Sequence, residues 1–166
     1  MKKFVLIIAA CFLFSSCEKD DICDPSTATT PNLVIEFYDF SQPTLTKNVV
    51  NLQVTGVGES AAFNTFNGVS KIKIPLKTLA DNTQFSMKLN STSTSSSNED
   101  VMQFNYTRSN IYVSRACGYK TVFQLNTANP VQLTDAVVPD AFWIKDFDIQ
   151  TNAINNQNEV HIKIYF

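Results

Sequence analysis

Short stretches in which every second residue is apolar constrain this chain more than any other feature. Residues 70–76 place Ile72, Ile74 and Leu76 on one side with lysines between them, and residues 84–89 repeat the pattern. A period of two is typical of a β-strand with one buried face. Other β-rich stretches recur at spacings of about 10–15 residues, separated by turn-forming residues, although the apolar residues of 33–38 occupy both faces. They are residues 33–38, 48–55, 101–106, 111–113, 119–125, 142–150 and 160–166.

These patterns predict an all-β domain of about eight or nine strands. The spacing favours an antiparallel β-sandwich of Greek-key or immunoglobulin-like type, or a barrel. We favour the sandwich because 13 phenylalanines can fill a core between two sheets. Two short segments, 76–81 and 134–141, are the best candidates for a helical turn.

The turns follow from the same reading. Asp81-Asn82 predicts a hairpin between strands 70–76 and 84–89, and Arg108-Ser109-Asn110 predicts a turn after strand 101–106. The hydroxyl-rich residues 90–98 are expected to form a mobile loop. Within 48–55 the alternation places Val50 on the same side as Leu52 and Val54.

The charge balance excludes one large class of partner. There are 13 basic and 15 acidic residues, giving a net charge of −2. A nucleic-acid-binding domain usually carries a basic surplus, so we expect no nucleic-acid partner. Ser, Thr and Asn supply 46 residues while charged residues make up only 17%. Polarity without charge is typical of an exported β-protein.

The first 16 residues have the order of a cleaved secretory signal. Two lysines precede an apolar run from Phe4 to Phe14, which is too short to span a membrane. The run ends at Ser15-Ser16-Cys17, which resembles a bacterial lipobox. The expected organisation is therefore a lipoprotein signal peptide at 1–16, a lipidated Cys17 with a tether at 17–31, and a β-sandwich domain at 32–166.

Two cysteines compete for the lipid. The residues before Cys11 fit the lipobox consensus better. Cleavage there, however, leaves a shorter apolar run and places the apolar residues Phe12-Leu13-Phe14 directly after the anchor. Cys17 ends the apolar run and is followed by a polar tether. We therefore predict lipidation at Cys17, with Cys11 as the alternative.

The tether itself carries a further signal. The residues after the predicted anchor are Glu18, Lys19, Asp20 and Asp21. They resemble the export signal of Bacteroidota lipoproteins, which implies the outer face of the outer membrane. The alternative is an ordinary solvated tether.

Cys23 and Cys117 are the two thiols that remain. An even count in an exported protein predicts a disulfide, and two separate buried thiols are the alternative. Neither cysteine has metal-ligand spacing, so we expect no metal and no cofactor. The bond would close a loop of about 95 residues, for which the chain-entropy model gives on the order of 4–5 kcal/mol. Because residues 18–22 span at most about 17 Å, we expect the disulfide to hold the domain close to the membrane.

Few residues are candidates for chemistry. His161 is expected to point outward from the last strand, without a catalytic partner. Asp146 and Asp148 share a strand face and are the only support for a hydrolase. Trp143 is expected to pack in the core rather than stack on a sugar. Four lysines are expected to protect a sheet edge, or else to face an anionic partner, and they are Lys71, Lys73, Lys77 and Lys88.

Three segments together resemble a family of small flavobacterial lipoproteins without an assigned function. They are residues 17–23, residues 29–39, and Cys117-Gly118-Tyr119-Lys120 with Phe123. Both cysteines fall inside these segments, which supports the disulfide, and the resemblance implies no reaction, cofactor or ligand.

The function expected from the sequence is that of a non-enzymatic lipoprotein. We expect it to be anchored to the outer membrane by its lipid, on the cell-surface face, as a binding or assembly module. An envelope protein or a glycan is the further partner. The alternatives are a periplasm-facing accessory subunit of an envelope complex and a glycan-active hydrolase.

Overall fold

A computed structural model describes residues 22–166, so Cys11, Cys17 and the predicted export signal lie outside the described residues. This range contains eleven β-strands and no α-helix, which confirms the all-β prediction with more strands than expected. The strands are β1 (Leu33–Tyr38), β2 (Leu52–Gly56), β3 (Asn64–Phe66), β4 (Lys71–Ile74), β5 (Asn82–Leu89), β6 (Asn98–Ser114), β7 (Gly118–Leu125), β8 (Val131–Asp135), β9 (Asp146–Ile149), β10 (Ala153–Ile154) and β11 (Ile162–Tyr165).

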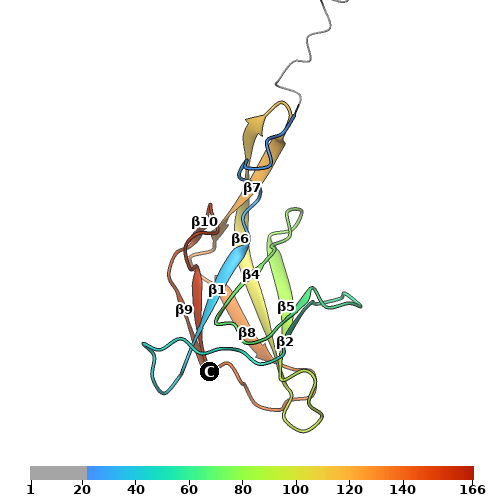
Figure 1. The fold of residues 1–166 in the computed structure, drawn as a ribbon, viewed down its shortest axis with the longest axis vertical. Coiled ribbons are helices and arrows are strands. Elements are labelled where there is room, and N and C mark those ends of the chain that lie inside the picture. Colours follow the sequence, from blue (N-terminus) through green and yellow to red (C-terminus); the bar gives the residue numbers. More distant parts are fainter. Residues whose placement is uncertain (1–21) are drawn as a thin grey trace, which may run out of the picture.

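The strands form two open sheets, as expected for a β-sandwich (Figure 1). The smaller sheet has the order β4-β1-β11-β9, and the larger has the order β10-β7-β6-β5-β2-β3, with β8 also pairing with β6. All pairs are antiparallel except β1 with β11. The parallel pair places the first and last strands side by side, and local sequence patterns gave no indication of it.

The core lies between the sheets and consists of the inward-facing residues of each strand. Ile72, Ile74 and Leu76 are buried as the alternation predicts. The largest fully buried side chains are Tyr106, Phe37, Phe104 and Phe123. Trp143 packs there too, in contact with Phe37 and Phe166, and its indole N–H donates to the carbonyl of Met87 at 2.9 Å. The expected core position of Trp143 is confirmed.

Residues 75–81 cross from one sheet to the other, so the predicted hairpin at Asp81-Asn82 is wrong. Strand β4 pairs with β1 in the smaller sheet, whereas β5 pairs with β2 and β6 in the larger. Alternation identifies a strand but carries no information on its partner, and two consecutive strands belong here to different sheets. Neither 76–81 nor 134–141 forms the expected helical turn.

The prediction that Val50 faces the core is wrong, because the alternation is broken just before β2. Asn51 has a φ of 44°, in the left-handed region, which interrupts the extended chain just before β2. Val49 is consequently buried and Val50 is exposed, while Leu52 and Val54 face the core.

Strand β6 continues through Arg108-Ser109-Asn110, where a turn was predicted. Its lower half pairs with β5 as far as Asn105, and its upper half, from Tyr106, pairs with β7. From Arg108 onward, β6 and residues 118–120 of β7 form a two-stranded ribbon without a buried residue, which accepts polar residues that resemble a turn. The chain reverses only at 115–117, and Gly118 follows with a φ of 68° that favours glycine.

This ribbon projects from the body of the domain (Figure 1). We call residues 108–120, together with residues 22–30 that run along them, the arm. None of these residues is buried. At about 3.3 Å per residue, the seven residues 108–114 extend roughly 20 Å beyond the body.

Candidate functional site

The predicted disulfide is present and lies at the end of the arm. Cys23 and Cys117 are bonded, with Cα atoms 4.9 Å apart. A second contact lies lower on the arm, where the Thr121 N–H donates to the Thr30 hydroxyl at 3.0 Å. The first described residues are therefore fixed along one edge of the ribbon, and they cover part of an otherwise unpaired strand edge.

The structure shows where in the domain the predicted disulfide lies. From the sequence we expect this bond to hold the domain close to the membrane. The structure places it at the tip of the arm, away from the body (Figure 1). The disulfide therefore fixes the tip, and the arm sets the distance to the body.

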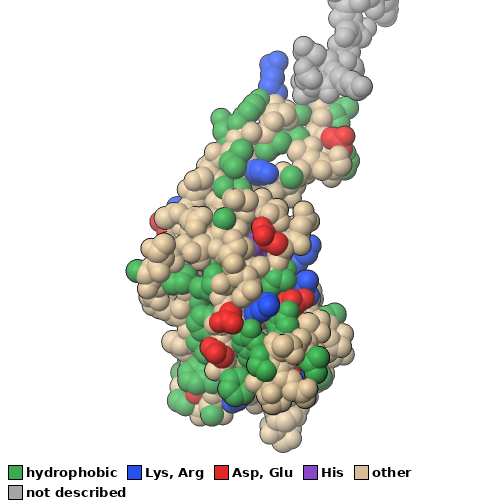
Figure 2. Space-filling view, turned by 90° about the vertical axis from the view of Figure 1, so that its left-hand side faces the viewer, with side chains coloured by type: hydrophobic (Ala, Val, Ile, Leu, Met, Phe, Trp, Pro, Cys, Tyr) green, Lys and Arg blue, Asp and Glu red, His purple; other side chains and the backbone are tan. Residues whose placement is uncertain are grey.

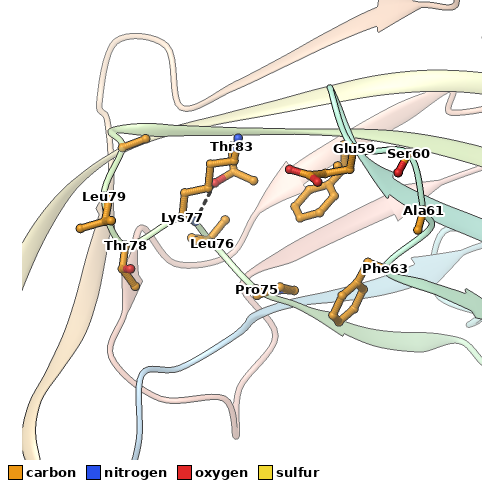
Figure 3. Close-up of a pocket in the computed structure, with 13 residues that line it drawn as sticks. Glu59, Ser60, Ala61, Phe63, Pro75, Leu76, Lys77, Thr78, Leu79 and Thr83 are labelled. Carbon is orange, nitrogen blue, oxygen red and sulfur yellow. Dashed lines mark hydrogen bonds between the residues drawn. The ribbon is translucent and has the colours of Figure 1, made fainter.

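An apolar pocket of about 710 Å³ lies in the body. Its walls come from the connection between β2 and β3 and from the crossing segment 75–81 (Figure 3). The apolar lining residues are Ala61, Phe63, Pro75, Leu76, Leu79, Ala80 and Phe85. Strand β3 ends the larger sheet and β4 ends the smaller one, so the pocket opens where the two edges of the sandwich are not joined.

The polar groups of the pocket divide into paired and unpaired ones. The buried Thr83 hydroxyl accepts the Lys77 N–H at 2.9 Å and bonds the Tyr106 hydroxyl at 2.6 Å. Its hydrogen-bonding capacity is used within the protein. Glu59 and the Lys77 side chain, by contrast, are exposed at the rim. The pocket offers an apolar interior with one charge of each sign at its entrance.

Two large apolar side chains at this pocket face solvent. Leu79 is 93% exposed and Phe63 is 49% exposed. Sequence reasoning missed this site because it read 76–81 as a helical turn. Leu79, a large apolar residue in a connecting segment, was the available signal.

His161 is buried, so the prediction that it points outward is wrong. Its Nδ1 accepts the Val34 N–H at 2.9 Å, and the backbone N–H of His161 donates to the Val34 carbonyl at 3.0 Å. Burial lowers the pKa of the ring, which is therefore neutral near pH 7. His161 precedes the first residue of β11, where strict strand alternation does not apply, and it pairs the end of β1 with the last strand.

The two aspartates proposed for a hydrolase lie on an exposed edge. Asp146 and Asp148 are on β9, at the end of the smaller sheet, and the Tyr165 hydroxyl donates to Asp148 at 3.0 Å. Neither lines the apolar pocket or the smaller hollows on the arm and at the far end of the body. Their position gives the hydrolase hypothesis no support.

The lysines do not form one stripe. Lys71 and Lys73 point outward from the edge strand β4, as expected for edge protection, whereas Lys88 lies in the larger sheet. Lys71 pairs with Glu36 at 3.0 Å, and the Tyr38 hydroxyl donates to Glu36 at 2.7 Å. That hydrogen bond raises the pKa of Tyr38 to about 12.

A buried carboxyl group lies at the opposite end of the body from the arm. Asp100 is fully buried, and one of its oxygens accepts the Ile144 N–H at 2.8 Å. Burial raises its pKa to about 6, with a further contribution from the charge of Asp135. Asp100 lies on the same face of β6 as the buried Met102 and Phe104, so its burial could have been predicted from the alternation in the sequence. It ties the segment before β9 to β6.

Two features are absent from residues 22–166, the part of the chain that the structure describes. No group of three or more His, Cys, Asp or Glu side chains in this range could hold a metal ion. The same range contains no helix long and apolar enough to cross a bilayer.

The comparison with protein families identifies the chain. Residues 51–166 match the model of DUF6452, a family of unknown function. The chain belongs to this family. No curated protein and no solved structure matches it.

The matched DUF6452 region includes every residue that lines the apolar pocket, together with Cys117. Cys23 and the tether precede it. The pocket is therefore part of the family domain, and one half of the disulfide comes from the segment before it.

Proposed function

We propose that the chain is a lipid-anchored envelope protein whose sandwich serves as a non-enzymatic binding module, with the apolar pocket as its binding site. The lipobox-like sequence at Cys17 supports the anchor. The size and apolar lining of the pocket support the binding role. The ligand is an apolar group, such as an acyl chain or an apolar side chain of a partner.

One observation carries this proposal. The first described residues are bonded to the tip of the arm, whereas the pocket lies in the body beyond the arm's base (Figures 1 and 3). A lipid at Cys17 would thus attach the molecule by one end and leave the pocket at a distance from the bilayer. That arrangement suits a module that binds a partner outside the membrane.

The anchor is tested by labelling with radioactive palmitate in a bacterium that processes lipoproteins. We expect Cys17→Ala to lose the label and Cys11→Ala to retain it. Retention of the label by Cys17→Ala, with loss in Cys11→Ala, moves the anchor to Cys11. No label in the wild-type chain refutes the anchor.

The membrane face is tested by treating intact cells with a protease. We propose the cell-surface face, because Lys19, Asp20 and Asp21 follow the predicted anchor directly. The protein should then be digested while a periplasmic control protein stays intact. Digestion only after lysis supports the periplasm-facing accessory subunit instead.

The pocket is tested with a dansyl-labelled fatty acid as the probe. We expect saturable binding to the wild-type chain and at least tenfold weaker binding to Ala80→Trp, because the indole fills the cavity. Ala128→Trp is the matched control, since Ala128 is exposed and outside the pocket. Equal binding to all three proteins would exclude the pocket as the site.

A further inference from the structure

The tip of the arm carries exposed apolar and aromatic side chains that lie outside the hydrophobic core. Tyr119 is 69% exposed, Tyr112 is 55% exposed, and Ile22 is 79% exposed. Ile111, on the adjacent position of β6, is also exposed. These four side chains add nothing to the core, and all of them lie within a few residues of the turn at 115–117 or of the disulfide.

Tyr112 and Tyr119 form a single aromatic unit. They are directly opposite each other on β6 and β7, and their rings meet edge to face with centroids 5.4 Å apart. Ile22 and Tyr112 line one hollow at the tip together with Arg115. The first described residue therefore lies against the aromatic side of the ribbon.

Two basic residues accompany this aromatic unit. Arg115 is exposed in the turn, and Lys120 follows Tyr119. Neither takes part in the three ion pairs among the described residues. Figure 2 shows basic and hydrophobic side chains together at the top of the arm. Tyrosine rings beside Arg or Lys are the combination found where proteins meet the headgroup layer of a bilayer.

We propose that the tip of the arm inserts into the headgroup layer of the membrane through Tyr112, Tyr119 and Ile22. This inference rests on the proposed lipid anchor and adds a second contact to it. The membrane is the expected partner of the tip because Ile22, at the tip, is separated from the predicted lipidated Cys17 by residues 18–21 alone. Residues 18–22 span at most about 17 Å, so a lipid on Cys17 keeps the tip within reach of the bilayer.

The dimensions agree with shallow insertion. The headgroup layer on each side of the bilayer is about 5–8 Å thick. Tyr112 and Tyr119 lie two or three residues from the turn, which corresponds to about 7–10 Å along the ribbon. When the turn reaches the boundary between headgroups and acyl chains, the two rings lie in the outer part of the headgroup layer and the body stays in water.

Charge is a minor part of this contact. Arg115 and Lys120 are opposed by Asp24 at the tip and by the acidic residues of the tether. Hydrogen bonds from Ser26 lower the pKa of Asp24, which is therefore ionised near pH 7. We therefore expect insertion into zwitterionic vesicles as well as anionic ones.

The test uses the acylated full chain in phosphatidylcholine vesicles that contain brominated lipid, which quenches tryptophan at the bilayer. Tyr119→Trp places a reporter at the tip, and Ala128→Trp places a matched reporter on the body, at an exposed position outside the pocket. The native Trp143 is buried in the core and serves as an internal reference. We expect at least twofold quenching of the added emission in Tyr119→Trp and none in Ala128→Trp.

Each outcome is decisive. Acylated Tyr119→Trp that floats with the vesicles but is not quenched overturns the insertion and leaves the anchor intact. A tip reporter that responds to protein concentration rather than to lipid shows pairing of two arms and also overturns it. Protein that does not float refutes the anchor and the insertion together. Tyr112→Trp repeats the measurement if Tyr119→Trp fails to form the disulfide.

Discussion

The arm and the body of this domain are held together by different forces. All the residues of the hydrophobic core lie in the body, where two sheets exclude water from aromatic and aliphatic side chains. The arm has no buried residue and is a two-stranded ribbon, a structure that is only marginally stable alone. A covalent bond, one cross-strand aromatic pair and the segment 22–30 replace the missing core. The difference shows that a β-domain can extend a strand pair well beyond its core when a crosslink closes the far end.

The largest expected effect is that of removing the disulfide. The bond joins residues 94 positions apart, and the chain-entropy model gives up to about 4–5 kcal/mol for such a loop. We expect Cys23→Ser with Cys117→Ser to lower the free energy of unfolding by up to this amount, measured by urea denaturation. Hydrogen exchange should accelerate first in residues 108–120. Arm amides that stay as protected as those of the body would show that the ribbon does not need the crosslink.

A core substitution should destabilise the body of the domain, whereas loss of the disulfide should loosen the arm first. Phe104 is fully buried between the sheets. We expect Phe104→Ala to cost about 3–5 kcal/mol, because it removes apolar contacts and leaves a cavity. The measurement is the midpoint of chemical denaturation with the disulfide intact. A loss below 1 kcal/mol would mean that the core repacks freely and that the crosslink dominates throughout.

The buried carboxyl at the far end of the body predicts a pH dependence. The pKa of Asp100 rises from an ordinary value of 3.8 to about 6 on folding, so between these values the folded chain binds more protons than the unfolded chain. Stability is therefore expected to fall as pH rises from about 4 to 6, by on the order of 2–3 kcal/mol from this group. Asp100→Asn should remove that slope.

The control for this measurement is the difference between the two proteins at each pH. Subtraction cancels the groups that they share, including His161, whose lowered pKa makes stability fall as pH decreases. Identical pH profiles for wild type and Asp100→Asn would show that the carboxyl is hydrated in solution.

The smallest expected effect is in the aromatic pair of the arm. We expect Tyr112→Ala to cost about 0.5–1 kcal/mol, which is typical of an exposed cross-strand aromatic pair. A double-mutant cycle with Tyr119→Ala, followed by exchange of the arm amides, isolates the pair itself. A loss as large as that of Phe104→Ala would mean that the arm has a core of its own.

Local patterns predicted the strands but not their partners. The alternation of residues 70–76 and 84–89 correctly gave two strands with buried faces, because burial on one side of a strand requires a period of two. It also suggested a hairpin between them, which the structure replaces with a crossing between sheets. The pocket lies against that crossing segment, so its existence could not follow from either strand alone.

The sequence by itself determined the all-β class, the core-facing residues of most strands and the pairing of Cys23 with Cys117, because alternation and an even number of thiols are properties of the chain. Only the tertiary structure decided where that bond lies. The unbroken course of β6 through Arg108 carries Cys117 to the tip of an arm. The burial of His161 likewise depends on the packing of its segment against the start of β1, and no local pattern encodes such packing.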